Sequence, residues 1–98
     1  MTIFALATAP GRGALAVIRI SGDRAGASLD ILSGAKRPQA RVARLRRLND
    51  PRTGRVLDEA LVLWMPGPTS FTGEDCVELH VHGGIAVTDS ILSALSEI

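Results

Sequence analysis

Cysteine and aromatic residues are scarce in this chain. Its 98 residues include one cysteine, one tryptophan, two phenylalanines and no tyrosine. A single cysteine, Cys76, excludes an internal disulfide and is typical of a reducing compartment, so we expect a cytoplasmic protein. This length allows one domain, and its hydrophobic core must consist mainly of alanine, valine, leucine and isoleucine.

Long hydrophobic runs are also absent. The longest apolar runs have the length of a strand, and no basic segment followed by an apolar one opens the chain. The sequence therefore predicts neither a signal peptide nor a membrane-spanning helix. Residues 85–98 have the pattern of a helix without a glycine or basic residue at its end, so we expect a fragment of a longer protein.

Basic residues are absent from the second half of the chain. No lysine or arginine follows Arg55, whereas residues 56–98 contain seven acidic residues. Eight of the eleven basic residues lie between positions 36 and 55, although the formal net charge is only +1. This segment can bind the phosphates of a nucleic acid, or it can be an edge strand whose arginines keep it soluble, and the pattern leaves both open.

Hydrophobic alternation and turn signals predict five strands and two helices. The expected strands cover residues 3–8, 14–21, 41–48, 55–65 and 75–82, and the expected helices run from an N-cap within 21–23 to about 32 and from 85 to 98. A helix competes over 41–48, because Val42, Leu45 and Leu48 recur every three residues, but the turn at 49–54 favours a hairpin. The predicted fold is α+β, a five-stranded mixed sheet with helices over one face.

The last predicted strand has two unlike faces. One face carries Cys76, Glu78, His80 and His82. The other face is apolar and carries Val77, Leu79 and Val81. The apolar set suits a core, and the other set places a carboxylate and two imidazoles in a row. Glu78 can accept two parallel hydrogen bonds from adjacent N–H donors of a heterocycle, or it can be an exposed strand residue.

A charged residue also interrupts the second predicted strand. Arg19 lies in an apolar run and by alternation points the same way as Leu15 and Val17. A buried guanidinium must reach water or pair with a carboxylate, because an uncompensated charge costs several kcal/mol, roughly. Two interpretations stay open: Arg19 pairs with a carboxylate such as Glu78, or it binds a carboxylate or phosphate of a ligand.

Other reactive groups give weaker signals. Glu78, His80 and His82 are a candidate metal-binding row, because residues two apart on a strand lie about 6.5–7 Å apart on one face. The sequence has no second cluster of ligands, so we predict no metal site. Cys76 has no activating partner and is expected to pack in the interior. No phosphate-binding loop is present, and we assign no catalytic residue.

Five short motifs follow one another in a specific order and spacing. They are Ala9-Pro-Gly-Arg-Gly13, Ile18-Arg-Ile-Ser-Gly22, Pro66-Gly-Pro68, Ser70-Phe-Thr-Gly-Glu-Asp75 and His82-Gly-Gly84. Together they resemble the N-terminal domain of the MnmE (TrmE) tRNA-modification GTPase family, and the resemblance runs from Ile3 to the last residue. Many members carry a different pair of residues where this chain has His80 and Val81.

The resemblance implies a fold similar to tetrahydrofolate-binding domains. It implies that residues 1–98 are a domain that binds a reduced folate, such as 5-formyltetrahydrofolate, and forms a homodimer. Two family folate contacts map onto Arg19 and Glu78. We expect Glu78 to accept N–H donors of the pterin and Arg19 to bind the glutamyl carboxylates. The turn at 9–13 and an apolar sheet edge are expected to contact the second copy, near the folate pocket.

Full-length members of the family are cytoplasmic and add a helical domain and a GTPase domain, both absent from this chain. With a flavin-dependent partner protein they modify carbon 5 of the wobble uridine in tRNA. GTP, magnesium and potassium belong to the GTPase domain, so we expect this chain alone neither to hydrolyse GTP nor to modify tRNA. Folate affinity is expected to be weaker without the helical domain.

Two alternative functions remain. The first is a stand-alone RNA-binding module that uses the basic segment from Arg41 to Arg55, although this segment has no interleaved aromatic residues for base stacking. The second is a small metalloprotein that uses Glu78, His80 and His82.

Overall fold

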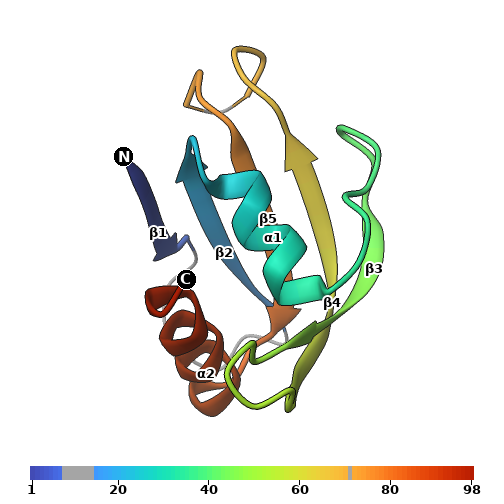
Figure 1. Cartoon of the computed structure of the whole chain (residues 1–98), viewed down its shortest axis with the longest axis vertical. Helices are drawn as coiled ribbons and strands as arrows, with labels where there is room; N and C mark the ends of the chain where they lie inside the picture. The colour runs from blue at the N-terminus through green and yellow to red at the C-terminus, as the bar shows by residue number, and fades with distance from the viewer. Residues whose placement is uncertain (8–14, 71) are drawn as a thin grey trace.

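The computed structural model describes residues 1–7, 15–70 and 72–98, which form five strands and two helices (Figure 1). In chain order the elements are β1 (Thr2–Leu6), β2 (Leu15–Gly22), α1 (Ala25–Ser33), β3 (Arg44–Asn49), β4 (Val56–Met65), β5 (Cys76–His82) and α2 (Ile85–Ser96). This order is the predicted one, and it confirms the α+β class. Neither of the described helices has the length and hydropathy needed to cross a membrane.

The sheet is antiparallel throughout the described residues. Its strand order is β1-β2-β5-β4-β3, and every pair of neighbours runs in opposite directions. The prediction of a mixed sheet is therefore wrong. Three of the four pairs join strands that follow each other in the chain, and a chain that turns straight back pairs antiparallel. The strand β5 enters between β2 and β4, antiparallel to both.

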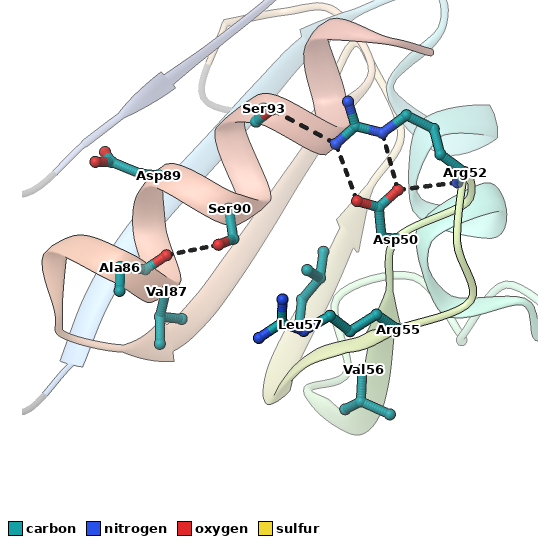
Figure 2. A pocket seen from close by; sticks show the side chains of 10 residues that line it. All are labelled: Asp50, Arg52, Arg55, Val56, Leu57, Ala86, Val87, Asp89, Ser90 and Ser93. Atoms are coloured by element: carbon teal, nitrogen blue, oxygen red, sulfur yellow. Dashed lines mark hydrogen bonds and ion pairs between the residues drawn. The ribbon is translucent and has the colours of Figure 1, made fainter.

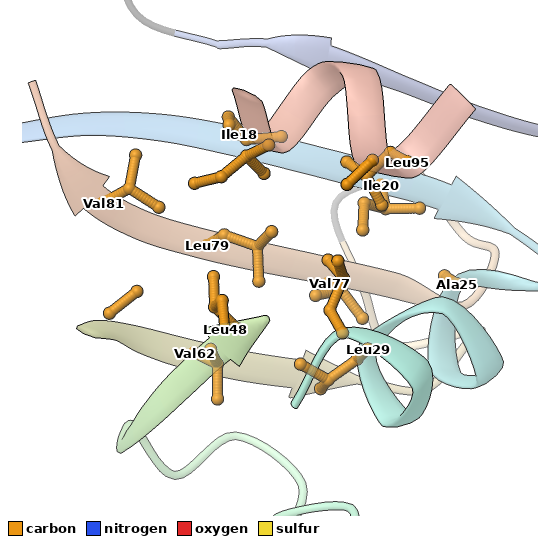
Figure 3. Close-up of a cluster of buried hydrophobic side chains, with 14 of the residues drawn as sticks. Ile18, Ile20, Ala25, Leu29, Leu48, Val62, Val77, Leu79, Val81 and Leu95 are labelled. Carbon is orange, nitrogen blue, oxygen red and sulfur yellow. The ribbon is translucent and has the colours of Figure 1, made fainter. Parts of the chain in front are cut away.

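Both helices pack on one face of the sheet, and the hydrophobic core lies beneath them (Figures 1 and 3). Ile18, Leu79 and Val62 are neighbours in register across β2, β5 and β4, and all three are fully buried. The helices contribute fully or almost fully buried side chains to the same cluster: Ala25, Leu29 and Leu32 from α1, and Ile91, Ala94 and Leu95 from α2. The core is mainly aliphatic, as the composition predicts.

The helix α1 starts later than predicted. Its N-cap is Arg24, with no side-chain hydrogen bond to the helix, instead of a residue within 21–23. The carboxylate of Asp23 accepts a hydrogen bond from Thr2 Oγ1 at 2.9 Å, so this side chain ties α1 to β1 and does not cap the helix. The end at Gly34 is confirmed, because Gly34 has φ 59° and donates its N–H to the Asp30 carbonyl.

The basic segment forms a strand, so the competing helix is excluded. The strand starts at Arg44 and not at Arg41, because Arg41 has a positive φ of 64°. Its N–H donates to the Trp64 carbonyl at 2.8 Å, and its guanidinium donates to the Thr69 carbonyl at 2.8 Å. The hairpin turn after β3 is confirmed, with Gly54 at φ 76°.

Truncation of Leu79 tests the position of the core. Leu79→Ala is expected to lower the free energy of unfolding by about 2–5 kcal/mol, since it leaves a cavity under both helices. Leu61→Ala changes the same side chain on the other face, where Leu61 is 46% exposed, and should cost less than about 1 kcal/mol. Urea unfolding at constant m-value measures both, and equal losses would contradict this assignment of the two faces.

Candidate functional site

A charged cluster lies on the face of the sheet that the helices leave open. Arg19 on β2 and Glu78 on β5 are directly paired in register. The guanidinium donates from Nη2 at 2.7 Å and from Nε at 3.1 Å, both to Oε2 of Glu78. On the other carboxylate oxygen, Oε1, His80 Nε2 lies at 3.1 Å. The alternation of β5 places Glu78 and His80 on one face, as the strand pattern predicts, and the pairing of β5 with β2 brings Arg19 to them.

The carboxylate of Glu78 is buried and ionised. Only 8% of the residue is exposed. Burial by itself raises the pKa of a carboxyl group, but the hydrogen bonds from Arg19 and His80 outweigh it and hold the pKa of Glu78 below its ordinary value. Because an ionised carboxylate can only accept, His80 must donate its Nε2 hydrogen to Oε1.

These contacts decide between two interpretations of the sequence. The pairing of Arg19 with Glu78 is confirmed, at 2.7 Å. The alternative in which Glu78 is an exposed strand residue is wrong, because the residue is buried. Its side chain contacts Arg19 and His80, and its strand β5 lies between β2 and β4. Alternation alone could not give this burial, because the open face of an antiparallel sheet is commonly in contact with water.

Apolar side chains surround the charged cluster on the open face. In register with the ion pair lie Ala5 on β1 and Leu63 on β4. Four large apolar residues of this face are 46–62% exposed: Ile3, Leu15, Leu45 and Leu61. A buried charged acceptor inside an apolar surface is suited to a flat heterocycle with N–H groups on one edge.

The loop between β4 and β5 rests on the end of β2. Ser21 Oγ lies 2.7 Å from Thr72 Oγ1, and Asp75 accepts the N–H of Gly67 at 3.0 Å. A Cβ on Gly67 would lie 2.7 Å from the carbonyl oxygen of Gly73, so only glycine fits there. Sequence reasoning missed Ser21, although it shares the open face with Arg19 two residues earlier.

His82 does not join the cluster. Its Nδ1 lies 2.7 Å from Asp58 Oδ1, and its backbone N–H donates to Asp58 Oδ2 at 2.8 Å. This contact ties the end of β5 to the start of β4, and the sequence contains no local signal for it, since the two residues are 24 positions apart. Across residues 1–7, 15–70 and 72–98, no three histidine, cysteine or acidic side chains group closely enough to hold a metal ion.

Cys76 is fully buried, and burial raises the pKa of its thiol, which fits a packing role. Gly84 is the N-cap of α2, so the predicted glycine junction between β5 and α2 is confirmed. The glycine-rich turn at 9–13, expected at the dimer contact, lies outside the described residues.

A hollow of about 400 Å³ lies between the β3–β4 hairpin and α2 (Figure 2). Arg52 borders it and is held in place: its guanidinium donates to both oxygens of Asp50, at 3.0 and 2.9 Å, and lies 3.5 Å from Ser93 Oγ. These hydrogen bonds lower the pKa of Asp50. Arg52 and Arg55 of the basic segment border this hollow, whereas neither Arg19 nor Glu78 does. The buried charged pair Arg19–Glu78 is therefore a separate cluster, and we take it as the candidate site.

Fold and cluster together define a small α+β domain whose open sheet face carries a buried, ionised carboxylate. Comparison with known proteins identifies the family of this domain. The family model described as "GTP-binding protein TrmE N-terminus" matches residues 2–98, and the chain belongs to this family.

Relatives with curated names agree with this family. A "tRNA modification GTPase MnmE" of Maricaulis maris (strain MCS10) is 60% identical over 96 residues, which cover 98% of this chain and 22% of the relative. The human "5-taurinomethyluridine-[tRNA] synthase subunit GTPB3, mitochondrial" is 58% identical over 98 residues, 99% of this chain and 20% of the relative. An MnmE of Pelagibacter ubique (strain HTCC1062) is 44% identical over 98 residues. The chain thus spans about a fifth of the length of these relatives.

Protonation of Glu78 is expected to destabilise the fold at low pH. Its pKa is lowered in the folded chain, so the ionised group contributes stability above the unfolded pKa, and this contribution is lost as the pH falls through the lowered folded pKa. Glu78→Gln has no such group, so the difference in free energy of unfolding between the two proteins should shrink as the pH falls. Urea unfolding from neutral pH to about pH 2 measures it.

Glu59→Gln is the matched control for this measurement. Glu59 lies on the neighbouring strand β4 and pairs with Arg47 at 3.5 Å, but both side chains are more than half exposed. Exposed pairs contribute less than about 1 kcal/mol, so this variant should follow the unmodified protein closely. A Glu78→Gln difference that stays constant over the whole pH range would contradict an ionised Glu78 in the folded state.

Proposed function

We propose that this chain is the N-terminal domain of a tRNA-modification GTPase that acts on carbon 5 of the wobble uridine. In this proposal residues 1–98 bind a reduced folate through Glu78 and Arg19 and mediate homodimerisation. Family membership and the names of the relatives support the tRNA-modification role. We further propose a cytoplasmic protein that acts with a flavin-dependent partner.

The observation that carries the folate proposal is the ionised Glu78 inside an apolar, open face. A pterin is flat and presents neighbouring N–H donors on one edge. A buried carboxylate that is already charged accepts such donors without first losing a proton, and hydrogen bonds to a charged acceptor contribute about 1.5–3 kcal/mol. The residues present therefore fit a pterin.

The ion pair changes the expected division of roles. Glu78 and Arg19 were expected at opposite ends of one folate, but their charged groups are only 2.7 Å apart. The benzoyl group of a folate separates pterin and glutamyl carboxylates by much more than this distance. We propose that both residues serve the pterin end: Glu78 accepts the ligand N–H, and Arg19 keeps Glu78 ionised and oriented.

His80 occupies the oxygen that the ligand needs. Arg19 takes Oε2 twice, so Oε1 is the oxygen with remaining acceptor capacity, and His80 donates there now. The His80 side chain is 31% exposed and can turn toward solvent when a ligand donor replaces it. His80 is thus proposed to compete with the ligand for one acceptor.

A bound reduced folate supplies a one-carbon unit, and the residues of this chain bind and orient it. GTP, magnesium and potassium are proposed to bind only in the GTPase domain of the full-length protein. Accordingly, we expect no GTP hydrolysis and no tRNA modification by this chain alone.

The homodimer is proposed to form at the β1 edge of the sheet. The strand β1 has a sheet neighbour on one side only, as far as the structure describes the chain, and its sequence Thr-Ile-Phe-Ala-Leu contains no charged residue. Ile3 is 62% exposed on the open face. An uncharged edge that continues into an exposed apolar surface is suited to a twofold contact with a second copy.

Calorimetric titration with 5-formyltetrahydrofolate tests the folate proposal. Glu78→Gln, a nearly isosteric change, is expected to weaken binding by at least about tenfold, since an amide replaces a charged acceptor and presents N–H groups to the ligand donors. Arg19→Met should weaken binding too, because Glu78 loses its main partner.

Glu59→Gln serves as the control in this titration, because it removes an exposed carboxylate from the neighbouring strand β4. The titration uses the full-length protein, so that contacts from the helical domain are present. Equal affinity of the unmodified and Glu78→Gln proteins would contradict a role of Glu78 in the pocket, and absence of binding to either would contradict the folate proposal.

Sedimentation of the full-length protein tests the dimer contact. Ile3→Asp should shift the protein toward the monomer, because it places a charge in an apolar contact. Leu45→Asp is the matched control, since Leu45 is 60% exposed at the opposite edge of the same sheet. A dimer that tolerates Ile3→Asp but not Leu45→Asp would place the contact at the β3 edge.

A further inference from the structure

The edge of the sheet opposite β1 is strongly basic. Residues 31–49 contain six lysines and arginines and no acidic residue. Three of these arginines, Arg44, Arg46 and Arg47, lie on β3, which pairs only with β4 among the described strands. We call these three residues and the outer side of β3 the basic edge.

The structure separates arginines that hold the fold together from those that do not. Arg37 donates to both oxygens of Asp30 and stacks on Trp64 at 4.6 Å. Arg52 likewise forms a bidentate ion pair, in which its guanidinium donates to both carboxylate oxygens of Asp50. Such guanidinium groups have structural partners and are poorly available to a ligand.

The arginines of the basic edge have few structural partners. Arg44 is exposed and forms no ion pair within the described part of the chain, and Arg46 donates from Nη1 to the carbonyl of its neighbour Leu45. Arg47 reaches Glu59 only at 3.5 Å, with both side chains more than half exposed, a geometry that contributes little. None of these three guanidinium groups is held by a buried carboxylate in the described part of the chain, although Nε of the half-buried Arg46 is itself buried.

We propose that the basic edge binds the sugar–phosphate backbone of the tRNA on which the full-length protein acts. This inference rests on the proposed tRNA-modification function. Because side chains alternate along a strand, Arg44 and Arg46 share one face of β3 and Arg47 lies on the other, so the three charges flank the outer edge from both faces. Guanidinium groups placed in this way, together with the N–H groups along a strand edge that has no described neighbour, are suited to phosphate oxygens. Among the described residues, the aromatic ring next to this edge is Trp64, and Arg37 covers it, so we propose a contact with the backbone that is independent of base sequence.

The two edges of the sheet are thus assigned to different partners. The uncharged β1 edge is proposed for the second copy of the chain, and the basic edge lies at the other end of the strand order. In a twofold dimer through β1 the two basic edges point away from the contact, where each is accessible to an RNA.

Salt-dependent binding of tRNA to the full-length protein tests the proposal. The variant Arg44→Gln/Arg46→Gln/Arg47→Gln should bind about a hundredfold more weakly at about 0.1 M salt, one decade below the reference of about 1 M at which the electrostatic difference vanishes. The slope of log K against log salt should become shallower by about 2, since each lost phosphate contact removes about 0.7–0.9 from the slope. The matched variant Arg44→Lys/Arg46→Lys/Arg47→Lys keeps the charges and should stay within about threefold of the unmodified protein.

Folate titration and thermal unfolding of the same proteins show whether the variants are folded. Should the triple variant aggregate, Arg44→Gln and Arg47→Gln alone should each reduce the slope by about 0.7–0.9. Unchanged tRNA affinity and an unchanged salt slope in folded glutamine variants would overturn the proposal. The arginines would then serve to keep an edge strand from pairing with other chains. Absence of tRNA binding by the unmodified protein would overturn both this proposal and the proposed role in tRNA modification. Absence of folate binding with intact tRNA binding would contradict only the proposed folate site.

Discussion

The register between β2 and β5 is the constraint on which both faces of this domain depend. It places Ile18 beside Leu79 in the core and, one residue further, Arg19 beside Glu78 on the open face. Because side chains alternate along a strand, a slip of one residue would put the charged pair under the helices and the core residues in water. The aliphatic core therefore stabilises the same register that assembles the candidate site.

Burial of Glu78 is tolerated only because its partners are in place. A buried carboxylate without a partner would take up a proton, whereas Arg19 and His80 keep this one charged. The cost of desolvation is thus offset in advance by the protein, and the acceptor is ready before a ligand arrives. The proposed folate site depends on this preorganisation more than on the shape of the surrounding apolar surface.

Local patterns in the sequence predict much of this structure. Alternation in β5 separates Glu78 and His80 from Leu79, and turn chemistry around Gly54 identifies the hairpin that excludes a helix over the basic segment. Glycines also mark the end of α1 and the start of α2. Each of these signals is contained within a few neighbouring residues.

The features that sequence reasoning missed all depend on contacts between distant segments. The antiparallel course of β5 follows from its insertion between β2 and β4. Asp23 binds Thr2 and so fails to cap α1, and Asp58 fixes His82 across two strands. The strand β3 begins at Arg44, because Arg41 has a positive φ and forms hydrogen bonds to the carbonyls of Trp64 and Thr69. No spacing in the sequence encodes these pairings.

The decisive measurement is a crystal structure of the full-length protein with 5-formyltetrahydrofolate. We expect pterin N–H donors within about 3 Å of Glu78 Oε1, with the Arg19–Glu78 ion pair intact and His80 turned away. A pterin bound elsewhere, with His80 still on Glu78, would contradict the assignment of this cluster as the folate site.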